Sequence, residues 1–519
     1  MEPKPEYPRR VGRPLRPDSK QQAENRRWAT PAYDIRVLDP DQAPAVDGVL
    51  ALPTVYVSTR LIIDKHADPD AVAAELNRLV GERGWQVEVE PEDGRTAGAK
   101  YGVRRLRISV VPGQAVSPPD AFALLQLARS SRNGKPIPGL GLDHVIGMHP
   151  WEASHPWEAS HPWEASHPWE ASHPWEASHP SNGGRLPIAY IGPRPARRDE
   201  ADITGRRPVV AVLDTGCGPH EWLDDVVDTN PHQDVGTVGY PDDETNPELH
   251  GDLTGPLDGA IDPHSGHGTF IAGLIHQACP DAAILAWRCV PSEGPLVESD
   301  WVATLSQVRD LVERHAANTG GKAIDVLSLS MGYYHETPQD EVFDDTLYQI
   351  LADITALGTI VVASAGNDAT SRPCYPAAFA PWSDGLGPVQ PEKKRPPIVS
   401  VGALNPNNET DALFSNAGPW VRAYTPGMAV MSTMPPYQGG GQPDYRREYL
   451  GRWRESLDPD DFRGGFGIWS GTSFAAPLLA GQLAAQLCDR LPDAGAPFDK
   501  DAAVALAWDV VEQHAGIAP

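Results

Sequence analysis

The sequence predicts an α/β protein, a doubly wound parallel sheet preceded by a small α+β domain with the ferredoxin-like order βαββαβ. Two observations support this prediction. In residues 206–519, continuous β-rich apolar runs alternate with helical patterns, as expected for strands covered on both faces. In residues 51–148, shorter patterns follow the order strand, helix, strand, strand, helix, strand. With 519 residues, 40% of them hydrophobic, the chain can bury several cores.

The first domain is expected to follow residues 1–50, a polar, proline-rich segment that predicts disorder. Order is expected from about residue 54, because 54–64 is rich in β-branched residues and predicts a strand. Asp68 before Pro69 predicts the N-cap and first turn of a helix. Later elements are predicted as strands at 85–90, 102–111 and 142–148, and as a helix at 120–129.

A connector at 149–205 contains five copies of WEASHP between residues 151 and 180. Six is neither a helical nor a strand period, whereas a polyproline II helix of about 3 residues per turn would place all five Trp on one face. We interpret the repeats as a flexible spacer. The alternatives are a Trp stripe that docks a partner and metal binding by the evenly spaced His, although their spacing matches no known ligand set.

The C-terminal domain, 206–519, is expected to hold the parallel sheet. Its strands are predicted at 209–213, 324–330, 359–365 and 398–404, with helices near 301–317 and 341–356. Ligands of such a sheet sit at the carboxyl ends of its strands.

Composition excludes several classes of function. The net charge of −27 disfavours a nucleic-acid binder, which needs a positive surface. The sequence contains no run of about 18 apolar residues of the kind that would predict a membrane span. The five cysteines, an odd number in a long chain, favour reduced thiols over a disulfide framework. The basic N-terminus lacks the apolar core of a secretory signal. We expect a cytoplasmic monomer, with leaderless export as the alternative location.

Three short motifs carry residues for nucleophilic catalysis. Asp214 ends a predicted strand in VAVLDTG, His267 opens a helix in SGHGTFIAG, and Ser473 opens another in SGTSFAAP. Singly, each has an ordinary structural interpretation as a turn, a helix start or an N-cap. Together they supply what acyl transfer requires: a hydroxyl, an imidazole base and a carboxylate that orients the base. Their chain order is Asp, His, Ser.

These motifs resemble subtilisin-like serine proteases, the subtilase family, over about residues 206–515. ASAGND at 363–368 is also similar, which implies that Asn367 donates to the tetrahedral oxyanion. LSLSMG at 327–332 resembles the strand that pairs with the substrate, and FSNAGPWVRAYTPG at 414–427 resembles a structural stretch. The resemblance implies a serine endopeptidase that acts on proteins or peptides and requires no cofactor for its chemistry.

The resemblance also implies a substrate cleft. Its walls would be Ser330, Met331 and Gly332 on one side and Ser364, Ala365 and Gly366 on the other. These residues are small or apolar, so we expect medium to large apolar P1 residues. Cys374 stands where the family places a pocket-base residue, and it either lines this pocket or is a buried structural thiol. His264, close to His267, is expected to be an exposed loop residue.

Two loops depart from the simplest family pattern. Family members often bind structural calcium, and the acidic loop 242–262 is rich in oxygen ligands, although an exposed acidic loop is the simpler interpretation. We name no calcium ligands. The long segment 434–469 before the nucleophile is interpreted as a surface insertion or as a gate over the cleft.

The N-terminal βαββαβ pattern resembles the propeptide domain of subtilases, which assists folding and inhibits the enzyme with its tail in the cleft. Here the tail would be Met148, His149, Pro150 and the first WEASHP repeats. Proline has no N–H, so pairing should fail beyond Met148. The alternative is a fused module that recognises a partner and is never removed. A second hypothesis for the whole chain is a binding or scaffold protein with an idle protease fold.

Overall fold

The structure is a computed structural model, and it describes residues 33–46, 48–114, 116–148, 184–254, 257, 259–290, 296–338, 345–440 and 446–518. The WEASHP repeats, with the three interpretations given for them, lie outside the described residues. The first 32 residues of the segment expected to be disordered lie outside them as well.

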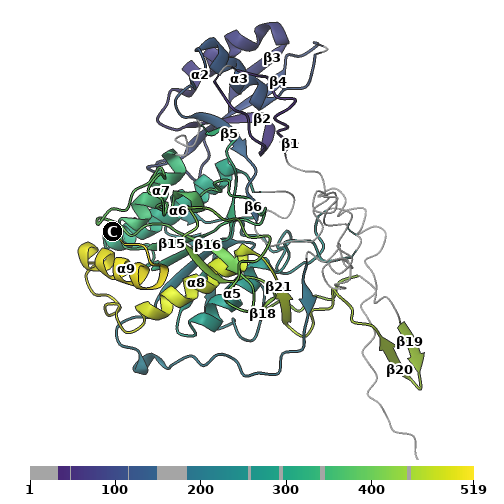
Figure 1. Ribbon diagram of the computed structural model, residues 1–519, viewed down its shortest axis with the longest axis vertical. Coiled ribbons are helices and arrows are strands. Elements are labelled where there is room, and N and C mark those ends of the chain that lie inside the picture. The colour runs from purple at the N-terminus through teal and green to yellow at the C-terminus, as the bar shows by residue number, and fades with distance from the viewer. Residues whose placement is uncertain are drawn as a thin grey trace, which may run out of the picture.

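A parallel sheet lies at the centre of the larger part of the molecule (Figure 1). It has seven strands in the order β17-β16-β15-β13-β8-β12-β9. Its strands are β8 (Val209–Asp214), β9 (Val227–Asp228), β12 (Ala283–Arg288), β13 (Val326–Leu329), β15 (Ile360–Ser364), β16 (Val399–Leu404) and β17 (Ala423–Pro426). Four of them lie where continuous apolar runs predict them. The sequence analysis missed β9, β12 and β17.

Both faces of this sheet are covered by helices, which confirms the predicted α/β class. Along β8, Val210 and Val212 pack into one apolar core and Ala211 and Leu213 into another, because successive side chains of a strand point to opposite faces. The first core includes α5 (His267–Ala278), α8 (Thr472–Leu487) and α9 (Lys500–Ala515). The second includes α6 (Glu298–Ala316) and α7 (Asp345–Thr355).

The N-terminal part is an antiparallel sheet with two helices, in the βαββαβ order that the sequence predicts (Figure 1). Its central strand β2 (Val55–Asp64) pairs with three others. Asp68 caps α2 through a 3.0 Å bond from the backbone N–H of Ala71. The remaining elements are β1 (Ile35–Val37), α2 (Pro69–Val80), β3 (Trp85–Val89), β4 (Val103–Val110), α3 (Ala121–Ser131) and β5 (Leu140–His144).

Two expectations about this part are wrong. Order begins earlier than residue 54, because β1 pairs with β2 inside the segment expected to be disordered. The strand expected at 142–148 is two strands, β5 and β6 (Gly147–Met148). The chain leaves the first sheet between them, since Val145 and Ile146 bond to Val297 and Leu296 of the larger part.

The long segment before α8 contains an exposed hairpin that projects from the body of the molecule, as expected for a surface insertion (Figure 1). No helix in the described parts of the chain combines the length and the apolar character needed to cross a bilayer. The smaller elements are η1 (Gly81–Arg83), β7 (Leu186–Pro187), η2 (Glu200–Asp202), β10 (His232–Gln233), β11 (Gly236–Thr237), β14 (Met331–Gly332), η4 (Ala377–Phe379), β18 (Val430–Thr433), β19 (Arg446–Tyr449), β20 (Arg452–Glu455) and β21 (Phe466–Trp469).

Candidate active site

The carboxyl end of β8 and the first residue of α5 bring a carboxylate and an imidazole into contact. Asp214 Oδ1 lies 2.7 Å from His267 Nδ1, and neither residue is exposed to solvent. The same carboxylate oxygen accepts the backbone N–H of Thr215 at 2.8 Å, which fixes its position. His267 Nε2 bonds to no group among the described residues. The imidazole is therefore oriented through one nitrogen and retains the other for chemistry.

Ser473 is the second residue of α8, and the interior proline of that helix explains its local geometry. Pro477 has no N–H, so the carbonyl of Ser473, four residues earlier, loses its helical hydrogen bond. Ser330 Oγ donates to that carbonyl instead, at 2.9 Å. In return, Ser473 Oγ donates to Ser330 O at 3.1 Å. The ring of Phe474, the next residue, has its centroid 5.3 Å from that of His267, so the start of α8 packs against the imidazole.

Asn367 follows β15 and faces the start of α8. Its Oδ1 accepts the backbone N–H and the hydroxyl of Thr472, each at 2.9 Å, which places its Nδ2 donor at the opposite end of the amide. Gly366 has φ +101°, and a Cβ there would lie 2.4 Å from Nδ2 of Asn416. Asn416, in the predicted structural stretch 414–427, also donates to the carbonyl of Ala365 at 2.8 Å. Glycine is thus required directly before Asn367.

The residues predicted to form the cleft walls lie near this site. Met331 and Gly332 form β14, which pairs antiparallel with β6 of the N-terminal part, with Met331 opposite Met148. His149, Pro150 and the repeats, the rest of the expected tail, lie outside the described residues. Ser364, Ala365 and Gly366 run from the end of β15 to Asn367 and are buried.

Cys374 is fully buried, and burial raises the pKa of its thiol, so it is no nucleophile. Whether it lines the pocket stays a prediction. His264 lies in an exposed loop, as expected.

Glu248 is a buried carboxylate that the sequence analysis missed. It is wholly shielded from solvent, and burial raises its pKa to about 7 despite hydrogen bonds from Thr215 and Thr269. Oε2 accepts the hydroxyl of Thr269 at 2.5 Å, and Oε1 accepts the backbone N–H of Gly268 at 3.1 Å and the hydroxyl of Thr215. One carboxylate thus joins the residue after Asp214 to the two residues after His267.

The acidic loop 242–262 does not present a convergent set of oxygen ligands in its described part. Asp262 Oδ2 accepts two backbone N–H groups of the loop itself, at 2.6 and 2.8 Å. Asp242 accepts from Arg288 and from Thr245. These carboxylates are engaged in shaping the loop, and a calcium site stays a prediction.

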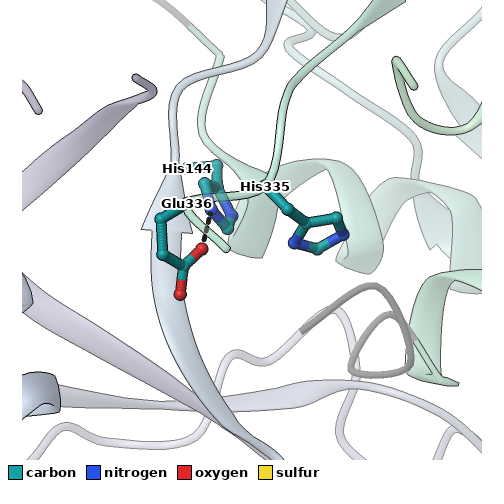
Figure 2. A group of neighbouring side chains, drawn as sticks. All are labelled: His144, His335 and Glu336. Carbon is teal, nitrogen blue, oxygen red and sulfur yellow. Dashed lines mark hydrogen bonds and ion pairs between the residues drawn. The ribbon is translucent and has the colours of Figure 1, made fainter. Parts of the chain in front are cut away.

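A buried cluster joins the N-terminal part to the larger part (Figure 2). His144 Nδ1 lies 2.7 Å from Glu298 Oε2, and its Nε2 lies 3.0 Å from Glu336 Oε2. Burial alone would lower the pKa of His144, but the hydrogen bonds to both carboxylates raise it to about 10. Burial would raise the pKa of Glu336, but the hydrogen bond from His144 and the charge of its imidazolium lower it to about 2.

The potential ligand atoms of His144, His335 and Glu336 lie within 4.8 Å of one another, as a metal site would require. However, both nitrogens of His144 already bond to carboxylates, and Arg129 lies 3.4 Å from Glu336 Oε1. Two carboxylates, an imidazolium and a guanidinium balance in charge. The cluster is therefore an ion-pair network.

Comparisons with known proteins find relatives among bacterial serine proteases. Mycosin-4 of Mycobacterium tuberculosis is 28% identical over 302 residues, 54% of this chain and 56% of that protein. An intracellular serine protease of Paenibacillus polymyxa is 26% identical over 57% of this chain and 70% of that protein. Subtilisin E of Bacillus subtilis is 25% identical over 54% of this chain and 55% of that protein. The chain thus spans little more than half the length of two of these relatives.

Among solved structures, fervidolysin from Fervidobacterium pennivorans matches with a TM-score of 0.44 and 18% identity, over 86% of this chain and 56% of that chain. The model of the subtilase family matches residues 205–503, more than half of the sequence. The chain therefore belongs to the subtilase family.

Proposed function

We propose that the protein is a serine endopeptidase that hydrolyses peptide bonds through Asp214, His267 and Ser473. The observation that carries this proposal is the 2.7 Å bond from His267 Nδ1 to Asp214, with the other imidazole nitrogen buried beside the start of the helix that bears Ser473. This is the arrangement that activates a hydroxyl for attack on a carbonyl carbon.

The proposed reaction has two steps. Ser473 Oγ turns from Ser330 O toward His267 Nε2, gives up its proton and attacks the peptide carbonyl. Asn367 Nδ2 and the backbone N–H of Ser473 stabilise the oxyanion. His267 then protonates the leaving amine, and later deprotonates the water that hydrolyses the acyl-enzyme. Asp214 stabilises the imidazolium in both steps.

We further propose that the N-terminal part restrains this activity by occupying the substrate strand. A substrate in extended form would pair with β14 by main-chain hydrogen bonds. The pairing of Met148 with Met331 and of Gly147 with Gly332 uses that strand edge. A protein substrate must therefore displace β6 before it binds.

The contact between the two parts also supports this restraint. Helix α6 starts after Val297, whose side chain cannot cap it. Asp143 of β5 supplies the cap, accepting the backbone N–H and the hydroxyl of Ser299 at 2.9 Å each. Beside it, His144 pairs with Glu298 in the same first turn. The N-terminal part thus completes a helix of the larger part.

The substrates that we propose are proteins or peptides with an apolar P1 residue, since the proposed walls carry no acidic side chain. The test compares the purified wild type with Ser473→Ala on an unfolded protein, and sequences the N-termini of both. Ser371→Ala, at an exposed serine, is the matched control. The proposal expects cleavage by the wild type and the control only. Cleavage by Ser473→Ala at the wild-type rate would contradict a nucleophilic role for Ser473. No cleavage by the wild type, even after release of its N-terminal part, would favour the scaffold alternative.

The same samples separate a removable inhibitor from a permanent module. Intact mass after prolonged incubation should show, for the wild type alone, cleavage between residue 148 and the larger part if the N-terminal part is removed by the enzyme itself. An unchanged mass in active wild-type protein supports the fused module instead.

A further inference from the structure

Two thiols meet at the far ends of the helices that carry the proposed base and nucleophile. Cys279 is the C-cap of α5, whose first residue is His267, and Cys488 is the C-cap of α8, whose second residue is Ser473. Their sulfur atoms lie 3.8 Å apart, in van der Waals contact, and the bond is not formed. The structure also has no disulfide bond at Cys217, Cys289 or Cys374.

The packing of the two helices holds this contact in place. A Cβ at Gly481 of α8 would lie 2.6 Å from Cβ of Ala278, so only glycine allows α8 to approach α5 this closely. Ala278 directly precedes Cys279. The two helix ends are therefore brought together by backbone packing and not only by the thiols.

One arginine fastens the loops that follow the two cysteines. Arg198 Nε donates to Asp281 Oδ2 at 2.7 Å, and its Nη1 donates to Asp489 Oδ2 at 2.8 Å. Asp281 lies two residues after Cys279, and Asp489 comes directly after Cys488. The guanidinium of Arg198 thus bonds to both of the turns that follow the two cysteines.

The two thiols differ in access and in acidity. Cys279 is 1% exposed, whereas Cys488 is half-buried. The hydrogen bond from Cys279 lowers the pKa of the Cys488 thiol, and the same bond together with burial raises the pKa of Cys279. An oxidant from solvent therefore reaches Cys488 first, and the Cys488 thiol loses its proton more readily than that of Cys279.

We propose that Cys279 and Cys488 are a redox-active pair that forms a disulfide in response to a low-molecular-weight disulfide such as oxidised glutathione. The Cys488 thiolate attacks one sulfur of the oxidant, which forms a mixed disulfide and releases one glutathione thiolate. Cys279 loses its proton, and its sulfur attacks the Cys488 sulfur and releases the second glutathione. The two protein thiols are oxidised, the oxidant is reduced to two thiols, and the two protons pass to them.

The bond would join α5 to α8 at the ends remote from the active site. With 1.5 Å per residue, the 12 residues of α5 put Cys279 about 18 Å along the axis from His267. The disulfide is therefore a staple of the two helices and leaves the reacting groups in place. It closes a loop of about 200 residues, which makes it strongly stabilising in the chain-entropy account.

The test uses the full-length Ser473→Ala protein, so that self-cleavage cannot interfere. After treatment with oxidised glutathione, intact mass should fall by about 2 Da, and a nonreduced digest should contain one cross-linked pair, the peptides of Cys279 and Cys488. The added Cys279→Ser change should stop the reaction at Cys488, with a gain of about 305 Da from one glutathione. Added Cys488→Ser should abolish both products, while added Cys217→Ser should leave the cross-link intact.

The melting temperature of the oxidised protein should rise by about 5 °C, and dithiothreitol should reverse the rise. A cross-link between any other pair, a stable glutathione adduct on Cys488 with Cys279 present, or no mass change at all would overturn the proposal. If a cysteine variant does not fold, the nonreduced digest of the Ser473→Ala protein alone shows whether Cys279 and Cys488 are cross-linked. None of these outcomes depends on proteolysis, so they stand apart from the proposed function.

Discussion

Replacing His144 by glutamine should release the proposed restraint on the active site. The change removes a cationic group that lies within hydrogen-bond distance of both Glu298 and Glu336. Glu336 is then left with Arg129, and Glu298 with the hydroxyl of Tyr333. Breaking one partner out of a buried ion-pair network is costly, because the remaining charge has no compensation. Docking of the N-terminal part should therefore weaken.

The pKa of His144 sets the magnitude. Docking raises this pKa from 6.5 to about 10, so the imidazolium stabilises the docked state. At pH 7, protonated His144 stabilises the docked state over the three pH units between 7 and its pKa of about 10. At 1.36 kcal/mol per unit, this is about 4 kcal/mol of docking free energy. The stabilisation is complete below about pH 6.5 and is lost as the pH rises through 10. The fraction of molecules with an open cleft should increase by up to about 1,000-fold in the variant.

The assay has two readouts at pH 7. Cleavage of an unfolded protein should increase in His144→Gln, and hydrogen exchange should accelerate in peptides that contain Met148 or Met331. His66→Gln is the matched control, because His66 is exposed and bonds within the N-terminal part. Wild-type activity should also rise toward pH 10, whereas that of the variant should not. Unchanged exchange at Met148 and Met331 in His144→Gln would refute the reasoning.

Three further changes have defined outcomes. Asn367→Ala should lower kcat about 10²- to 10³-fold with little change in KM, measured by steady-state peptide hydrolysis. A rise in KM with kcat unchanged would contradict an oxyanion role. Glu248→Gln places an NH₂ group against the donors of Gly268 and Thr269, so kcat/KM should fall about 10-fold while circular dichroism shows an intact fold. Full activity would show that the carboxylate does not position His267. Burial, with the nearby Arg194 and Arg197, lowers the pKa of His276 to about 4. The folded state then binds fewer protons than the unfolded one between pH 4 and 6.5, so unfolding free energy should drop by about 1–2 kcal/mol from pH 8 to 5, and His276→Phe should lose this slope in denaturant titrations.

The sheet and the proposed triad were largely predictable from sequence. A continuous apolar run that ends in Asp214 places that carboxylate at the carboxyl edge of a parallel sheet, and Asn367 follows a second such run. The glycine before His267 has φ +86°, and the N-termini of α5 and α8 follow from the glycine-containing motifs at their starts. Local pattern placed Asp214, His267 and Ser473 at the ends of their elements, whereas the role expected of Asn367 came from the family resemblance.

The buried acids were not predictable in the same way. Glu248 is one of many acidic residues in a loop without periodicity, and only the packed structure distinguishes it from its exposed neighbours. His144 meets its two carboxylates across 154 and 192 residues of sequence, through the docking of one part on another. The strand at Ile35–Val37 escaped notice because three residues carry too short a pattern.

The most direct test of the central claim is covalent labelling with a serine-reactive phosphonate, followed by peptide mapping. In His144→Gln, where the cleft is expected to be open, the reagent should add one phosphonyl group at Ser473, and His267→Ala in that background should abolish the addition. An adduct on another serine, or labelling of Ser473 that persists without His267, would contradict a hydroxyl activated by this imidazole.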